Sequence, residues 1–433
     1  MKKIITILLL LQGLLMGAEI KYIDIKGVQI PIVYEYSNYI PAVSIRFVFK
    51  NSGSLNDTQR GLSKFASSML NEGTKKDGST GFATKMDNEA ISIFSYSGYE
   101  TFSIEASSLK EKFERSINLL SELLSDPNYT ENSLEKIKKQ KIAKIVRKES
   151  DFGYIASKKL KEILFANTPL ENSSIDTKES VEKTSIEDIK TFINSTLGYN
   201  NLIVVIGGDI SFKDATKYVN QIVTSLPKVS KSQIDMIEAK NIKKVKVIRE
   251  QTQQAHLHFG APFNLKYNDS NLYIAKVASY ILGDSGFGSR IMEEIRVKRG
   301  LAYSVGASFI NYKFANYFQG YLQTKLESIN EAKKVVQEVV DNFVRNGVTQ
   351  KELDGAKKFI LGSEPLKNET LSQRINSDYI NFLFNRDANY NKLELEKIEA
   401  LTLKDLNNFI KFHQEIKDIS FVMVVADDTN ITK

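Results

Sequence analysis

The chain contains one arrangement of segments twice. Three segments of its first half recur in the second half in the same order, displaced by 212 to 219 residues. The pairs are Gly61–Leu70 with Tyr273–Leu282, Thr130–Lys139 with Thr349–Lys358, and Ser185–Ile193 with Thr402–Ile410. A repeat of about 200 residues is long enough for each copy to bury its own core. We therefore expect two homologous domains.

The boundaries of these domains follow from a change in composition. Between Pro227 and Asn241, Lys, Ser and Pro replace the apolar periodicity seen elsewhere, which is typical of a linker. We expect a first domain over residues 19–226, a linker over 227–243 and a second domain over 244–433.

Each half mixes strand and helix patterns. Apolar side chains recur at every second position in Val43–Lys50 and in Ala255–Phe259, which predicts half-buried strands. Leu109–Leu124 and Val336–Phe343 have helical spacing, and the second of these ends near Gly347, a residue suited to a helix C-terminus. The expected fold class is α+β, in which each domain is a mainly antiparallel sheet with helices packed on one face.

The residue types that are missing limit the chemistry. The chain has no Cys, which excludes disulfides, thiol nucleophiles and every metal site that needs Cys. Its three histidines are His256, His258 and His413, too few for an ordinary histidine-ligated metal site. The net charge of +7 is spread along the chain, whereas proteins that bind duplex nucleic acid have a clustered basic footprint. We expect no nucleic-acid partner.

The first eighteen residues have the organisation of a secretory signal peptide. Lys2 and Lys3 precede an apolar run from Ile4 to Leu15, and small residues end the segment at Ala18. The apolar run is too short for a membrane span, which needs about 20 residues. We expect cleavage after Ala18 and a periplasmic mature protein without stable membrane insertion.

Several strings in the second half resemble one family of peptidases. They are Gln251–Gly260, Leu282–Arg290 and Glu294–Val305. Together they resemble the pitrilysin/insulinase (M16) metallopeptidases, in particular the bacterial branch that is similar to the mitochondrial processing peptidase, and the resemblance covers residues 20–430. It implies a clamshell of two α+β halves, in which paired subunits enclose a chamber where unfolded peptides are cut.

The zinc motif of that family is altered here. Active members carry His-x-x-Glu-His on a helix and a further Glu about 76 residues on, so that two His on one helical face bind zinc and the first Glu activates a bound water. The corresponding residues are Lys64 and Ser68 for the His ligands, Ser67 for the base and Lys144 for the third ligand. A Lys ammonium has no lone pair to offer a metal. We predict no metal and no cofactor in this chain, a degenerate member of the family.

The part of the family's site that contacts substrate is retained. Arg296 and Tyr303 match an Arg/Tyr pair with which the family holds the substrate backbone and stabilises the tetrahedral intermediate. A guanidinium can donate to a peptide carbonyl, and a phenol can donate to a developing oxyanion. The alternative interpretation is that Arg296 is a solvated charge on a helix and that Tyr303 is an ordinary strand aromatic.

A second stretch matches the family's edge strand, to which substrate adds by β-augmentation. The expected substrate-binding residues are Ile91, Ser92, Ile93, Phe94 and Ser95. The match is incomplete, because Ile93 stands where the family usually has Asn.

The three histidines and a glycine cluster are further candidates for metal or phosphate binding, and each has a simpler explanation. His256 and His258 share one face of a predicted strand, but no third metal ligand is evident and the polar face of a half-buried strand accounts for them. We expect His413 on the surface of a helix. The Gly283–Gly288 cluster lacks the Lys-Ser/Thr of a phosphate-binding loop, so we expect a turn between helices.

Three functions are compatible with these residues. In family members built from two different subunits, the zinc and the Arg/Tyr pair can lie on different chains. The leading hypothesis is therefore a non-catalytic subunit that donates Arg296 and Tyr303 to the zinc site of an M16 paralogue, its heterodimer partner, and is inactive alone. The alternatives are a non-enzymatic peptide-binding or structural scaffold, and a self-sufficient metallopeptidase whose metal site has moved to His256 and His258.

Overall fold

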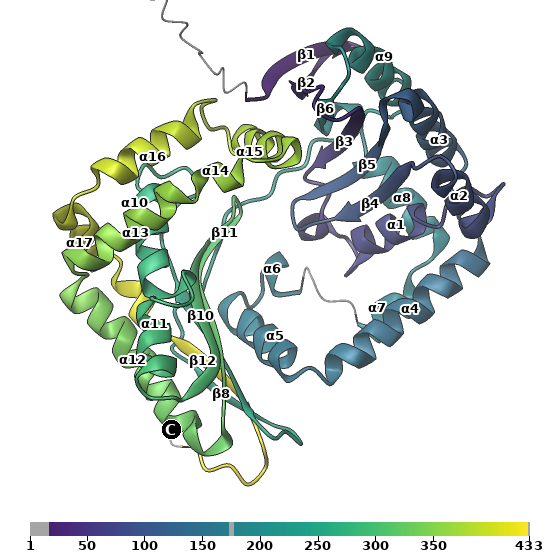
Figure 1. Ribbon diagram of the computed structural model, residues 1–433. Coiled ribbons are helices and arrows are strands. Elements are labelled where there is room, and N and C mark those ends of the chain that lie inside the picture. Colours follow the sequence, from purple (N-terminus) through teal and green to yellow (C-terminus); the bar gives the residue numbers. More distant parts are fainter. Residues whose placement is uncertain (1–16, 173–176, 432–433) are drawn as a thin grey trace, which may run out of the picture.

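Two sheets, one from each half of the chain, face each other as the halves of a clamshell (Figure 1). The computed structural model describes residues 17–172 and 177–431. The expected signal peptide falls almost entirely on residues 1–16, outside the described ranges. Within those ranges, no helix has the length and hydropathy needed to cross a bilayer.

The first sheet has the strand order β1-β2-β6-β3-β5-β4 and the second the order β10-β11-β9-β12-β8. The strands of the first sheet are β1 (Glu19–Ile25), β2 (Val28–Tyr36), β3 (Ala42–Lys50), β4 (Ser92–Ser97), β5 (Thr101–Leu109) and β6 (Leu202–Gly208). Those of the second are β8 (Val245–Arg249), β9 (Ala255–Pro262), β10 (Ala302–Asn311), β11 (Ala315–Thr324) and β12 (Ser420–Val425), with a short β7 (Ile237–Glu238) beside β11. Pairing is antiparallel except for β2 with β6, β8 with β12 and β7 with β11. Both sheets are therefore mainly antiparallel, as predicted.

The repeat in the sequence is a repeat in the fold. Strands β2, β6, β3, β5 and β4 correspond in order to β8, β12, β9, β11 and β10, and each series begins with a parallel pair. Matching helices also begin in the same way. Thr130 and Thr349 each cap a helix by accepting a backbone N–H three residues later, and so do Ser185 and Thr402.

Helices cover the outer face of each sheet (Figure 1). The helices of the first half are α1 (Leu62–Leu70), α2 (Gly78–Asp87), α3 (Phe113–Ser125), α4 (Glu131–Glu149), α5 (Phe152–Leu164), α6 (Pro169–Asn172), α7 (Lys178–Lys183), α8 (Ile186–Thr196) and α9 (Phe212–Val223). Those of the second are α10 (Leu272–Ser279), α11 (Arg290–Met292), α12 (Ile329–Asn346), α13 (Gln350–Gly362), α14 (Glu364–Lys367), α15 (Leu371–Leu383), α16 (Tyr390–Ala400) and α17 (Leu403–Phe412). Two π-helical turns, η4 (Tyr280–Asp284) and η5 (Glu293–Val297), follow α10 and α11. Each half has its own apolar core between sheet and helices.

Two helices cross over to the opposite half. Helix α5 of the first half packs on β9 and β12 of the second sheet, and α15 of the second half packs on β2 and β6 of the first sheet. This contact explains why Val48 and Ile203, on the face away from their own helices, are also buried and apolar. Each sheet is thus covered on one face by its own helices and partly on the other by a helix from the other half, which adds to the predicted layer arrangement.

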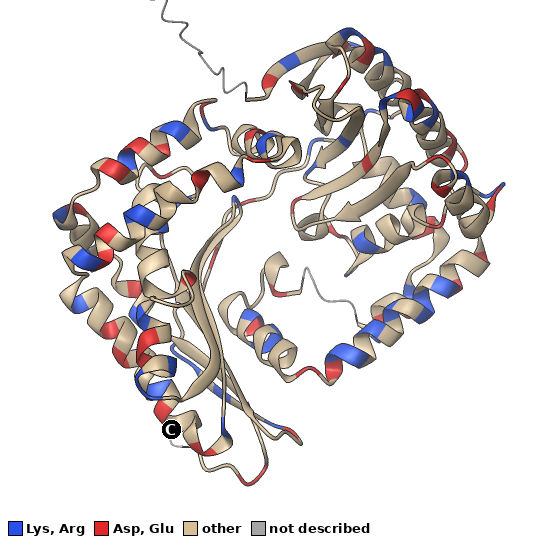
Figure 2. Cartoon of the chain, viewed as in Figure 1, with Lys and Arg blue, Asp and Glu red and all other residues tan. Residues whose placement is uncertain are grey.

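Contacts between the corresponding hairpins also join the two halves. Tyr99, in the β4–β5 turn, packs on the rings of Tyr312 and Phe314 in the β10–β11 turn. Beside these rings, Lys313 Nζ lies 3.5 Å from a carboxylate oxygen of Glu100. Basic and acidic side chains are both distributed over the helices (Figure 2), although α4 carries mainly Lys and Arg.

Candidate functional site

The structure places Arg296 beside Tyr303. Arg296 lies in η5 and Tyr303 near the start of β10, where the pairing with β11 shifts register between Ala302 and Ser304. The centre of the Arg296 guanidinium is 5.0 Å from the centroid of the Tyr303 ring. The Tyr303 side chain is 82% exposed, so its hydroxyl faces solvent. The two residues that the resemblance pairs are in contact in the fold.

A third residue, Phe287, completes this cluster. The Arg296 guanidinium lies 4.8 Å from the Phe287 ring, so it sits against two aromatic faces in a cation–π arrangement. Phe287 is 69% exposed and stands between Gly286 and Gly288, whose φ angles of 65° and 92° only Gly adopts readily. The Gly cluster does form the expected turn between helices. It also presents Phe287 to Arg296, a role that the sequence pattern alone did not indicate.

Two cationic side chains near Arg296 are paired with a carboxylate, whereas Arg296 is not. Lys298 and Arg299 both donate to the Glu294 carboxylate, and these hydrogen bonds hold the pKa of Glu294 below its usual range. Within the described ranges, the guanidinium of Arg296 makes no hydrogen bond or ion pair. Its N–H groups are oriented by two rings and remain available to an acceptor from another molecule, as the predicted contact with a substrate backbone requires.

The positions of the altered zinc motif lie on two helices. Lys64, Ser67 and Ser68 are on α1, and the Ser67 and Ser68 hydroxyls both donate to the Lys64 carbonyl oxygen, at 3.0 and 2.8 Å. Lys144 is an exposed residue of α4, and Lys141 of the same helix lies over the ring of Phe65. Two ammonium groups and two hydroxyls that are bonded to their own helix do not fit a zinc ion.

His256 and His258 lie under α5, next to Asp151 and Phe152. Burial lowers the pKa of both imidazoles, and that of His258 to about 4. In residues 17–172 and 177–431, no three His, Cys, Asp or Glu side chains gather closely enough to hold a metal ion. The strand face that carries both histidines is covered by a helix of the other half and is not an open polar surface.

The prediction for His413 was wrong. His413 is the C-cap residue that follows α17, and it is 3% exposed and packed against the rings of Phe263 and Phe409. Its Nδ1 lies 2.8 Å from a carboxylate oxygen of Glu415. The helix ends at this residue, and the chain turns the imidazole into the core, where the carboxylate satisfies its polar atom.

The burial of His258 predicts a loss of stability in acid. The pKa of His258 is about 4 in the folded protein, below the usual 6.5. Between these two pH values, the imidazole is therefore protonated in the unfolded chain and neutral in the folded protein. Protonation of His258 in the unfolded chain does not reduce the free energy of unfolding above about pH 6.5, and it reduces this free energy progressively as the pH falls toward 4. Between about pH 7 and pH 4.5, we expect the free energy of unfolding of the natural chain to fall about 2.5 kcal/mol more than that of His258→Gln. Urea unfolding at both pH values measures this difference, and equal losses in the two chains would contradict the assignment.

The predicted substrate strand lies at a sheet edge. Ser92, Ile93, Phe94 and Ser95 belong to β4, and Ile91 immediately precedes it. Among the described strands, β4 pairs only with β5. Ile91, Ile93 and Ser95 are buried, whereas Ser92 and Phe94 are exposed. Helix α1 packs beside this edge, and the Ser95 hydroxyl donates to the Ser67 carbonyl oxygen at 2.8 Å. The altered zinc motif and the predicted substrate strand are therefore neighbours.

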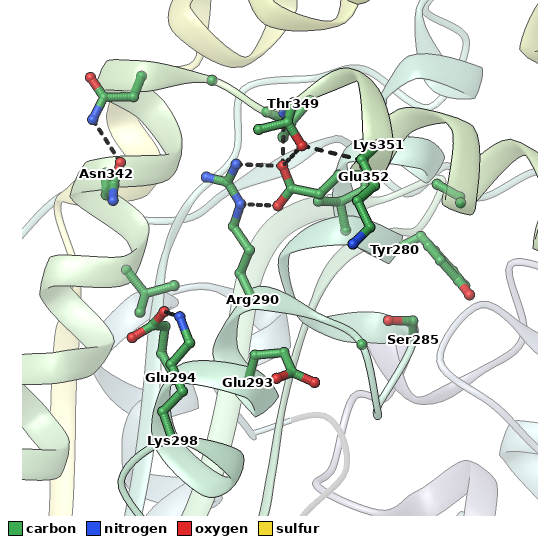
Figure 3. A pocket seen from close by; sticks show the side chains of 18 of the residues that line it. Tyr280, Ser285, Arg290, Glu293, Glu294, Lys298, Asn342, Thr349, Lys351 and Glu352 are labelled. Atoms are coloured by element: carbon green, nitrogen blue, oxygen red, sulfur yellow. Dashed lines mark hydrogen bonds and ion pairs between the residues drawn. The ribbon is translucent and has the colours of Figure 1, made fainter.

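A cavity of about 870 Å³ lies in the helical layer of the second half, between η5, α12 and α13. In Figure 3 the Arg290 guanidinium lies directly against the Glu352 carboxylate in the lining of this cavity, with Nε and Nη2 donating at 2.5 and 2.8 Å. These bonds and those from Thr349 hold the pKa of Glu352 at about 2 although burial opposes ionisation. The Arg290–Glu352 ion pair in the lining of the cavity thus satisfies both charges and joins α11 to α13.

Comparisons with known proteins agree with this architecture. Two family models match the chain: Insulinase (Peptidase family M16) over residues 31–178 and Peptidase M16 inactive domain over residues 183–360. The "non-peptidase homolog YmxG" of Helicobacter pylori is 42% identical over 428 residues, 98% of either chain. A solved structure of a peptidase M16 inactive domain from Pseudomonas fluorescens has a TM-score of 0.86 at 24% identity, covering 96% of this chain and 99% of that one.

A second solved structure is a protease from Helicobacter pylori, with a TM-score of 0.78 at 14% identity, covering 94% of this chain and 99% of that one. The two family matches together span most of the chain, one in each half. With the close relative and the two-sheet clamshell, they show that this chain belongs to the M16 peptidase family.

Proposed function

We propose that the chain is the non-catalytic subunit of a heterodimeric peptidase that cleaves unfolded peptides in the periplasm. It lends Arg296 and Tyr303 to a catalytic site whose zinc is held by a partner chain, an M16 paralogue. The Arg296 guanidinium binds a carbonyl oxygen of the peptide backbone, and the Tyr303 hydroxyl donates to the oxygen on which negative charge develops. The edge strand β4 is the proposed contact for an extended peptide.

The observation that carries this proposal is the contrast between the two parts of the site. On α1 and α4, the positions that would bind zinc and activate water are Lys64, Ser67, Ser68 and Lys144. In the second half, the Arg296 guanidinium packs against two aromatic rings, and within the described ranges its N–H groups make no hydrogen bond. An oriented guanidinium with free N–H groups beside an exposed phenol is the arrangement that the proposed contact with substrate needs.

The relatives support a pairing of unlike chains. Helicobacter pylori contains a protein described as a non-peptidase homologue, to which this chain is 42% identical, and a protease of the same fold. One bacterium thus has at least one chain of each kind. Export to the periplasm is proposed from residues 1–18, whose lysines, apolar run and small residues are typical of a signal peptide.

Mixing experiments test the proposal. The mature chain and a paralogue from the same organism with an intact His-x-x-Glu-His motif are purified separately, and cleavage of a reduced, carboxymethylated protein is measured for each and for the mixture. We expect the mixture to cleave and the chain alone to be inactive. Metal-dependent cleavage by the chain alone would contradict the proposal.

A peptide-binding scaffold is the second candidate, favoured by the loss of all four positions of the zinc motif. In that case the chain would bind the unfolded protein, and adding any paralogue would leave cleavage unchanged. The mixing experiment therefore separates the two candidates.

A further inference from the structure

The outer edge of β4 is closed at its centre by a side chain of the same protein. Asn71 lies at the C-terminus of α1. Its Nδ2 donates to the Ser95 carbonyl oxygen at 2.9 Å, and its Oδ1 accepts the Ser95 backbone N–H at 2.7 Å. The Asn71 carboxamide thus forms with Ser95 both hydrogen bonds that one residue of a neighbouring antiparallel strand would form.

Ser95 is the middle of the three residues that β4 offers to a new strand. In an antiparallel ladder, the backbone groups of alternate residues point to opposite edges. Since the groups of Ser95 bond to Asn71, those of Ile93 and Ser97 point the same way, and those of Phe94 and Tyr96 point to β5. With Ser95 occupied, a peptide could reach only the two outer positions, which do not make a continuous ladder.

In the second half, the residue that corresponds to Asn71 has no carboxamide side chain. The 212-residue offset between the repeated helices pairs Asn71 with Gly283. The matching hairpin turns, with Gly98 bonded to Thr101 and Tyr312 bonded to Ala315, pair Ser95 with Phe309, whose backbone N–H donates to the Ser279 hydroxyl at 3.0 Å. A Cβ atom on Gly283 would lie 2.5 Å from the Ala307 carbonyl oxygen, so the helix backbone itself touches the edge strand and no side chain fits between them. In both halves, the end of a helix thus contacts the edge strand, which is β4 in the first half and β10 in the second. Only in the first half does a side-chain carboxamide, that of Asn71, make this contact.

We propose that Asn71 competes with peptide for β4, so that an incoming strand must displace its amide from Ser95. The inference rests on the proposed peptide-binding role of β4. Edge strands of natural proteins are commonly protected against unwanted pairing, and here one exposed side chain provides the protection at the point of substrate entry. Asn71 therefore sets how tightly the first half holds an extended peptide.

Hydrogen exchange on the full mature chain tests this competition. The probe is reduced, carboxymethylated α-lactalbumin, and the readout is the exchange rate of the β4 amides as the probe is titrated. In Asn71→Ala without probe, the Ser95 amide should exchange about tenfold faster than in the natural chain, because one hydrogen bond is lost. The probe should restore protection, with a half-saturating concentration about tenfold lower than in the natural chain.

Two variants make the result specific. Asn71→Asp keeps an acceptor for the Ser95 N–H but loses the donor to its carbonyl, so its half-saturating concentration should fall between the other two. Asn88 also caps a helix C-terminus, that of α2, and its side chain makes no hydrogen bond in the described ranges. Asn88→Ala should therefore behave like the natural chain.

Three outcomes would overturn the inference. Equal Ser95 exchange in Asn71→Ala and the natural chain would show that the amide does not protect the strand. Equal half-saturating concentrations would show that it does not compete with peptide. Absence of protection at β4 in every chain would overturn the peptide-binding role of the strand as well, whereas failure of the Arg296 and Tyr303 proposal would appear only in the cleavage rate of the mixed subunits.

Discussion

Replacing Arg374 with Ala is expected to lower the free energy of unfolding by about 3 to 5 kcal/mol. Arg374, on α15, donates from Nε and Nη2 to Oε1 of Glu35 on β2, at 2.9 and 2.7 Å. The Glu35 side chain is 5% exposed, and burial raises its pKa in spite of the guanidinium. Removing the cation leaves a buried carboxylate without a counterion between the two halves. Urea unfolding at neutral pH measures the loss.

Two controls separate charge from packing in this experiment. Glu35→Met combined with Arg374→Met removes both charges and keeps the volume apolar, so it should lose less stability than Arg374→Ala. Lys392→Ala removes a cation 4.0 Å from Glu396 in an exposed pair, and should change stability by less than about 1 kcal/mol. A similarly small loss for Arg374→Ala would contradict the view that this ion pair ties α15 to the first sheet.

In the mixed-subunit peptidase, Arg296→Ala is expected to lower kcat/KM, because it removes a donor to a carbonyl of the bound peptide. Tyr303→Phe is expected to lower kcat about 100- to 1,000-fold, the usual cost of losing one donor to a developing oxyanion. Tyr303→Phe removes only the hydroxyl and keeps the ring that lies 5.0 Å from the Arg296 guanidinium. It should lower kcat and leave the amount of bound peptide unchanged. The measurement is the turnover of an unfolded substrate at saturating partner concentration.

Arg299→Ala is the matched control for Arg296→Ala. Arg299 follows η5 and is paired with the Glu294 carboxylate, so its removal should leave turnover within about twofold of the natural chain. Equal losses for Arg296→Ala and Arg299→Ala would indicate a general effect of charge or stability. Unchanged turnover in Arg296→Ala and Tyr303→Phe would show that the pair takes no part in hydrolysis.

The architecture was largely predictable because it depends on local patterns that occur twice. Alternation in Val43–Lys50 predicted β3, and helical spacing predicted α3, although its helix begins at Phe113 and not at Leu109, which ends β5. The exchange of α5 and α15 was not predictable. Their apolar faces look like those of any amphipathic helix, and only the three-dimensional fold shows that they cover the sheet of the other half.

The site was predictable only where a motif carried it. Arg296 and Tyr303 were found by resemblance, and the structure brings them together. Phe287 and Asn71 have no motif of their own: one stands in a Gly-rich turn and the other is a polar residue at a helix end. His413 was misplaced because a His beside Lys411 suggests a surface, whereas the end of α17 turns it into the core.

The zinc content of the purified mature chain tests most directly whether catalysis belongs to another subunit. After incubation with zinc and gel filtration, mass spectrometry of the metal should find far less than one zinc ion per chain, because Lys64 and Lys144 offer ammonium groups and Ser67 and Ser68 donate to their own helix. About one tightly bound zinc per chain, lost in Ser68→Ala, would contradict the account.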